Sequence, residues 1–203
     1  MSSSSHPDQY LTVSGPVQGI YKELRSKFIS FIYPVTTPEE AEEIVASLKS
    51  QYFNAKHHCY AYRIGVEGDV WRTNDAGEPS STAGKPILGQ LLSANLSDVL
   101  LVVVRYFGGT KLGIPGLIRA YREAAKDAIE KSTIVEKVLT APVEIEFPYS
   151  QTESVMRILK GFSPIYQEQL FDNNCKFKIS LRLGEIERFI KEMEQIENVK
   201  TSI

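Results

Sequence analysis

The chain has 203 residues, a formal net charge of −2, and 42% hydrophobic and 24% charged residues, a composition typical of soluble globular proteins. No apolar stretch reaches the ~20 residues that a membrane helix needs, so we expect no membrane segment. A sequence pI near 6.0 argues against avid, nonspecific binding of nucleic acid. The start of the chain lacks the features of a secretion signal, and we expect a cytoplasmic protein.

Residues 1–17 are expected to be a flexible tail, followed by extended segments at 19–27 and 28–35. Thr37-Pro38-Glu39-Glu40 reads as a capping box with proline at the first helical position, so a helix should begin there. A strand pair is predicted at 57–65 and 69–73.

A helix is then predicted over 82–96, where apolar residues recur at helical spacing. Residues 99–104 form a continuous apolar run rich in valine, which indicates a strand buried on both faces. Another helix should follow a glycine-rich turn, with Pro115 at its first position.

The pattern changes near Thr140. Strand, helix, strand, strand, helix and strand are predicted in that order, which is typical of a ferredoxin-like module. The predicted segments are 140–147, 151–160, 164–171, 174–183, 185–196 and 199–203. We therefore expect an α+β fold with two domains, 18–138 and 139–203.

Two cysteines, Cys59 and Cys175, fall in different predicted domains, so no disulfide is expected. His57-His58-Cys59 offers metal-ligating side chains, but no further Cys or His at metal-site spacing completes four ligands. We predict no metal site and no cofactor. The glycine-rich turn also matches neither the P-loop nor the dinucleotide fingerprint, which disfavours ATP and NAD.

The turn after the apolar strand gathers positive charge. Five basic residues and one acid lie between Val99 and Lys126, in a chain that is slightly acidic as a whole. Glycines allow another molecule to approach the backbone, and the unpaired amides of a helix start can bind an anion. The candidate anion or nucleic-acid site comprises Arg63, Lys85, Arg105, Tyr106, Gly108, Gly109, Lys111, Gly113, Arg119 and Arg122.

Aromatic side chains interleave with these arginines, which favours RNA with unpaired bases over duplex DNA. Tyr62, Trp71 and Tyr106 are the candidates for stacking on bases. Each of them has a plain structural alternative as a packing residue.

The run from Arg105 to Tyr121 resembles the signature of the IMPACT family, including its bacterial YigZ-like members. Ala61-Tyr62-Arg63 and the segment Asp75 to Pro86, with Gly-Glu-Pro-Ser inside it, add to this resemblance. Ser81, where many members have glycine, and Ile114-Pro115 depart from the family pattern.

The resemblance implies an amino-terminal domain similar to domain IV of elongation factor G and to a ribosomal-protein domain. It also implies a ferredoxin-like carboxy-terminal domain similar to one of a translation factor. Eukaryotic relatives regulate a kinase pathway that restrains initiation. We therefore expect regulation of translation through RNA, the ribosome or a translation-associated protein.

Two other functions stay open. Asp75 and Glu78, with Ser80 in the same polar loop, suggest a hydrolase acting on a phosphoester or peptide. The loop lacks the Gly-x-Ser-x-Gly elbow, however, and turns commonly contain such residues, so an enzyme is the less favoured interpretation. A protein-docking adaptor without nucleic-acid contact is the other alternative. The sequence does not indicate an oligomeric state.

Overall fold

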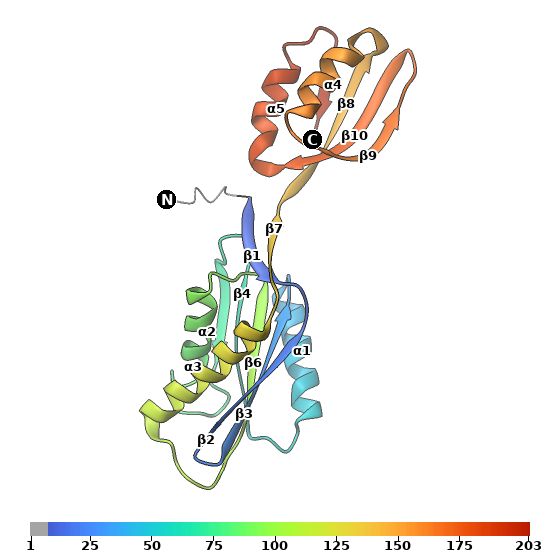
Figure 1. Ribbon diagram of the computed structural model, residues 1–203. Helices are drawn as coiled ribbons and strands as arrows, with labels where there is room; N and C mark the ends of the chain where they lie inside the picture. Colours follow the sequence, from blue (N-terminus) through green and yellow to red (C-terminus); the bar gives the residue numbers. More distant parts are fainter. Residues whose placement is uncertain (1–7) are drawn as a thin grey trace. The chain divides into compact units, whose positions relative to one another are not determined.

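The computed structural model describes residues 8–203 (Figure 1). Two compact units make up the described chain: Tyr10–Lys137, the amino-terminal unit, and Val138–Ile203 with the described residues up to Gln9, the carboxy-terminal unit. Both mix helices and strands, as the expected α+β class requires. The part of the predicted tail at 1–7 lies outside the described residues.

The amino-terminal unit is built on a five-stranded antiparallel sheet with strand order β2-β3-β6-β4-β5. The apolar run predicted to be buried is its central strand. The strands are β2 (Val17–Glu23), β3 (Ser26–Pro34), β4 (His57–Ile64), β5 (Val70–Asn74) and β6 (Val99–Tyr106).

Helices cover both faces of this sheet. The helix α1 (Pro38–Gln51) packs on one face, and α2 (Gly84–Ser93) and α3 (Gly113–Lys131) pack on the other (Figure 1). Successive side chains of a strand point to opposite faces, so the central strand contributes to both cores. Leu101 lies in the core under α2 and α3, and Leu100 lies in the core under α1. The prediction of a strand buried on both faces is confirmed.

The predicted start of α1 is confirmed, although only one of the two hydrogen bonds of the capping box forms as expected. Thr37 Oγ1 accepts a hydrogen bond from the Glu40 N–H at 3.2 Å, and Pro38 is the first helical residue. The Glu40 carboxylate accepts from the Thr36 N–H at 2.8 Å, one residue earlier than in the standard capping box.

Two strands were not predicted. Residues 9–13, which were expected to belong to a flexible tail, form β1 (Gln9–Val13), and β1 pairs with β7 (Ile134–Val138). Thr12 and Val13 are buried. The tail prediction is therefore wrong for this segment, because its partners lie far along the chain and leave no local signal.

The carboxy-terminal unit has the predicted order of elements. Its antiparallel sheet has strand order β11-β8-β10-β9, and its helices pack on one face through a core that includes Phe147, Phe177 and Phe189. The elements are β8 (Thr140–Pro148), α4 (Thr152–Lys160), β9 (Ile165–Leu170), β10 (Asn174–Arg182), α5 (Ile186–Met193) and β11 (Lys200–Ser202).

The segment Ser150-Gln151-Thr152-Glu153 has the sequence pattern of a capping box, but no side-chain cap forms at the start of α4. A short 3-10 turn at Tyr149–Gln151 precedes α4, and Gln151 is the residue before the helix, with no side-chain cap. Within residues 8–203, we find no helix that is both long enough and apolar enough to cross a membrane.

A buried polar network and a cationic groove

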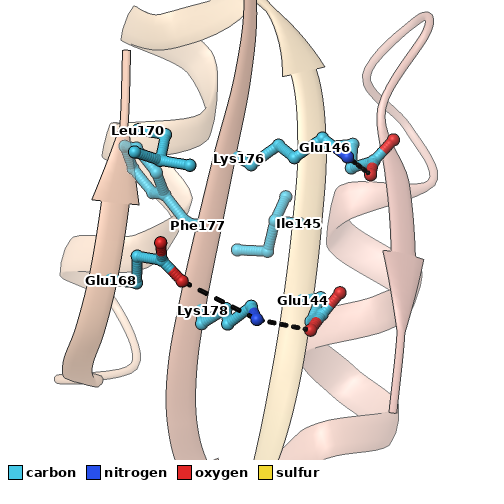
Figure 2. A pocket seen from close by; sticks show the side chains of 8 residues that line it. All are labelled: Glu144, Ile145, Glu146, Glu168, Leu170, Lys176, Phe177 and Lys178. Atoms are coloured by element: carbon cyan, nitrogen blue, oxygen red, sulfur yellow. Dashed lines mark ion pairs between the residues drawn. The ribbon is translucent and has the colours of Figure 1, made fainter.

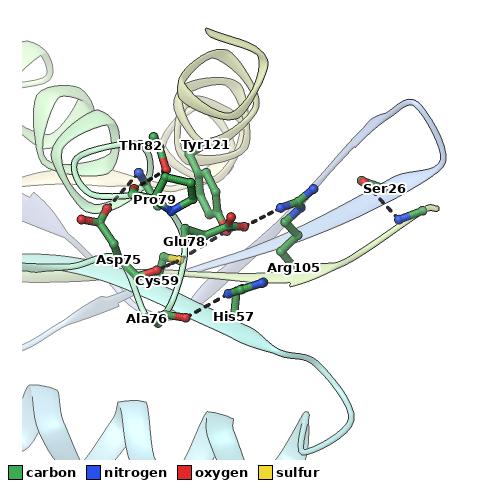
Figure 3. Close-up of polar contacts among 12 residues, drawn as sticks. Ser26, His57, Cys59, Asp75, Ala76, Glu78, Pro79, Thr82, Arg105 and Tyr121 are labelled. Atoms are coloured by element: carbon green, nitrogen blue, oxygen red, sulfur yellow. Dashed lines mark hydrogen bonds and ion pairs between the residues drawn. The ribbon is translucent and has the colours of Figure 1, made fainter. Parts of the chain in front are cut away.

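The polar loop before α2 is organised by Asp75. Its carboxylate accepts hydrogen bonds from the backbone N–H groups of Ser81 at 2.8 Å, Ala83 at 3.0 Å and Gly84 at 2.8 Å. Because the first amides of a helix have no partner within the helix, Asp75 satisfies the start of α2 (Figure 3). Ser81 has a φ of +63°, a conformation that favours glycine, which gives a physical reason for the glycine of other family members.

Glu78 and Arg105 form an ion pair inside the amino-terminal unit (Figure 3). Arg105 Nη1 lies 2.6 Å from Glu78 Oε1, and the two side chains are 6% and 4% exposed. The Tyr121 hydroxyl donates a second hydrogen bond to the same carboxylate oxygen at 2.9 Å. Burial raises the pKa of the Tyr121 hydroxyl well above its ordinary value, so Tyr121 is a donor at neutral pH.

Cys59 and His57 face the same loop from β4, as their alternation on a strand predicts. The Cys59 thiol lies 3.0 Å from the Asp75 carbonyl oxygen, and His57 Nδ1 lies 2.9 Å from the Ala76 carbonyl oxygen. Burial raises the pKa of Cys59 to about 12, so this thiol stays protonated and is a poor nucleophile. Within residues 8–203, no group of three or more His, Cys, Asp or Glu side chains is placed to hold a metal ion.

Two of the predicted phosphate-binding arginines have internal partners instead. Arg105 is buried against Glu78, and Arg63 donates to the carbonyl oxygens of Leu96 at 3.0 Å and Glu67 at 2.6 Å. Arg105 is too buried to reach an external anion, and two of the five donors of Arg63 are already engaged by backbone carbonyls, so these contacts do not support the predicted anion-binding role of the two arginines.

The three predicted stacking residues also differ in how accessible they are. Tyr62 is 5% exposed and belongs to the core under α1, so it cannot stack on a ligand. The Tyr106 hydroxyl donates to Asn54 at 3.2 Å. Trp71 is 58% exposed, on β5 at the edge of the sheet.

The glycine-rich turn is shaped by one close approach. A Cβ on Gly108 would lie 2.1 Å from the Arg25 carbonyl carbon and 2.3 Å from the Ser26 nitrogen, so only glycine fits. Gly109 and Gly113 have φ values of +89° and +70°, which also favour glycine. The sequence predicted Pro115 as the first residue of this helix. The helix α3 begins at Gly113 instead, so Pro115 is its third residue.

Arg119 and Lys111 differ in their surroundings although both are exposed. Arg119 forms an ion pair with Glu23 at the end of β2. The hydrogen bond from Arg119 lowers the pKa of Glu23 below its ordinary value. Lys111 forms no ion pair within residues 8–203.

A shallow groove of about 560 Å³ lies between α2 and α3. Lys85 from the first turn of α2 and Arg122 from α3 both line it, and both are exposed. The other lining residues carry no charge: Ser81, Pro86, Gly89, Gln90, Ser93 and Ile118. Two of the predicted cations are thus brought together without a carboxylate, in a place that an anion can reach.

The pocket on the carboxy-terminal sheet is different in charge. Lys178 lies 3.4 Å from Glu144 and 3.7 Å from Glu168, and Lys176 pairs with Glu146 at 2.5 Å (Figure 2). These lysines are balanced by carboxylates of neighbouring strands, so this pocket offers no excess of positive charge.

The fold and the groove define the class to which this protein belongs: two α+β units, with a buried ion pair and a cationic groove on the amino-terminal unit. The Impact N-terminal domain model matches residues 24–129, a span of just over half the chain. The chain belongs to the IMPACT family, which confirms the resemblance found in the sequence.

Bacterial relatives match over most of the chain. The IMPACT family member YvyE of Bacillus subtilis is 35% identical over 179 residues, 88% of this chain and 82% of that protein. The member YigZ of Escherichia coli is 31% identical over 154 residues, 75% of this chain and 76% of that protein. A crystal structure described as a hypothetical protein is 25% identical, with a TM-score of 0.67 and 96% of each chain covered.

Proposed function

We propose that this protein regulates translation in the cytoplasm by binding RNA of the ribosome through the groove between α2 and α3. The observation that carries the proposal is the pairing of Lys85 and Arg122 in one groove that no carboxylate lines. Phosphates are recognised by exposed cations, whereas cations already paired with carboxylates gain little from a new anion.

Family membership supports the translation role. The resemblance noted in the sequence includes eukaryotic regulators of initiation and domains similar to those of translation factors. The element order β-α-β-β-α-β and the strand order β11-β8-β10-β9 support a ferredoxin-like carboxy-terminal unit. The similarity of the amino-terminal unit to domain IV of elongation factor G is part of the same proposal.

The hydrolase alternative finds no support in the geometry of the loop. Asp75 accepts three backbone N–H groups, and Glu78 accepts from Arg105 and Tyr121. Carboxylates engaged in this way are held by the fold and are poorly placed to transfer protons to a substrate. Ser80 is exposed at the end of this loop.

Co-sedimentation with ribosomes tests the proposal. The double variant Lys85→Ala, Arg122→Ala should bind more weakly than the wild type. The matched control is Lys49→Ala, Lys56→Ala, which removes the same charge from exposed positions at the end of α1 and just beyond it. The control should bind as the wild type does. Equal binding by the groove variant would contradict the proposed site.

Nuclease treatment separates RNA from protein partners. If RNA carries the interaction, digestion of ribosomal RNA should release the protein from the pellet. Retention on the ribosomal proteins that remain would overturn RNA binding and favour the adaptor alternative.

A further inference from the structure

Phe107 is an exposed aromatic residue with a rigid support. It is 56% exposed, and the guanidinium carbon of Arg105 lies over its ring, 5.7 Å from the centroid. The same guanidinium carbon lies 5.5 Å from the centre of the Phe28 ring, and Phe28 packs edge-on against Tyr121. One face of Phe107 therefore rests on a buried layer, and the exposed part of the ring is turned away from it.

The backbone beside Phe107 is fixed in place. The Gly108 N–H donates to Ser26 Oγ at 3.1 Å, and the approach of Gly108 to Arg25 leaves no room for a side chain. Figure 3 shows the contact at Ser26 beside the buried ion pair. An exposed ring that is held in this way loses little conformational freedom when a ligand covers it.

Two exposed cations lie in the segments next to Phe107. Arg25 lies in the β2–β3 turn that touches Gly108, and Lys111 follows the glycines; both are exposed. Neither forms an ion pair within residues 8–203. The sequence has no Asp or Glu between Arg105 and Arg122.

The turn that carries Arg25 is also strained. Leu24 and Arg25 have φ values of +44° and +64°, which is uncommon for residues with a side chain. Such a conformation persists only where the surroundings hold it. Here the Gly108 backbone packs against the Arg25 carbonyl group, so the backbone of Arg25 lies beside the segment that carries Phe107.

We propose that Phe107 stacks on an unpaired base of single-stranded RNA while Arg25 and Lys111 contact the phosphates on either side of that base. The proposal rests on the proposed function, since it assumes that the chain binds RNA, and it names a further part of the binding surface. A flat ring beside unpaired cations is the arrangement that binds single strands, because every base offers a face for stacking. Bases inside a duplex are already stacked and cannot reach the ring.

The test uses an oligouridylate with one central 2-aminopurine, whose fluorescence changes when it stacks. The wild type should bind this single strand and change the emission, and its duplex with a complementary strand should bind more weakly. Phe107→Ala should weaken binding by about fivefold or more and abolish the emission change. Phe107→Tyr should retain both.

Phe53→Ala is the matched control, because Phe53 is 80% exposed and follows α1 at the opposite face of the sheet. It should bind as the wild type does. Unchanged affinity and emission for Phe107→Ala, or equal effects of the two alanine variants, would overturn the proposal. If that happens while the Lys85→Ala, Arg122→Ala variant still weakens ribosome binding, stacking alone fails and the proposed function stands.

Discussion

Arg105 and Glu78 form an ion pair beneath the glycine-rich turn, with both side chains almost completely buried. Removing one member of a buried pair leaves the other charge without compensation. We therefore expect Arg105→Ala to reduce the free energy of unfolding by about 3–5 kcal/mol, measured by urea denaturation. Loss of RNA binding by this variant would reflect the fold and not a lost phosphate contact.

The double variant Arg105→Met, Glu78→Gln separates this effect from packing. Neither charge remains in the double variant. Its loss of unfolding free energy should therefore be smaller than the sum of the losses for Arg105→Met and Glu78→Gln alone, with a coupling free energy above about 1 kcal/mol. Additive effects would show that the two side chains do not act as a pair.

Gly108 is the most constrained position of the turn. Gly108→Ala would force Cβ to within 2.1–2.4 Å of backbone atoms of Arg25 and Ser26, so we expect a loss of about 2 kcal/mol or more. Gly89 in α2 is the control, because a Cβ there meets nothing within 4 Å. Gly89→Ala should raise stability by about 0.5–1 kcal/mol, and thermal unfolding of both variants measures the contrast. Similar effects at the two positions would contradict the close approach.

Asp75 serves the start of α2. Asp75→Ala leaves three backbone N–H groups without their acceptor, and we expect a loss of about 2–3 kcal/mol and faster amide exchange at Ala83 and Gly84. Hydrogen exchange followed by NMR measures both effects. A variant with unchanged exchange and stability would reopen the question of a catalytic carboxylate.

The stability of the folded protein should depend on pH through Glu23. Its ion pair with Arg119 lowers its pKa in the folded protein, so the unfolded chain takes up this proton at higher pH. The stabilisation is present above the ordinary value of 4.5 and is lost as pH falls through the lower folded value. Glu23→Gln should therefore flatten the decline of stability on acidification. Glu130→Gln, in a fully surface pair with Lys126, should alter it less.

The sequence predicted most elements because their signals are local. Thr37 and Pro38 mark the start of α1, and the valine-rich run marks β6. The β2–β3 turn was placed three residues too late, because Leu24-Arg25 lacks the residues that such a turn usually contains. β1 was missed since its partners come from the other end of the amino-terminal unit.

The site was harder to predict than the fold. Charge counting along the chain could not separate Arg105, which is buried, from Arg122, which is exposed. The pattern of β6 could have indicated the burial of Arg105. A residue near the end of a strand that is buried on both faces also points into a core. Phe107, in contrast, carries no charge and was not among the predicted site residues; its exposure in the structure and the guanidinium beneath its ring are what indicate a binding surface.

The salt dependence of ribosome binding tests the central claim most directly. Each phosphate contact adds about 0.7–0.9 to the slope of log affinity against log salt, so loss of two cations should reduce the slope by about 1.5. We predict that reduction for Lys85→Ala, Arg122→Ala and no reduction for Lys49→Ala, Lys56→Ala. Identical slopes for the wild type and the groove variant would contradict the account.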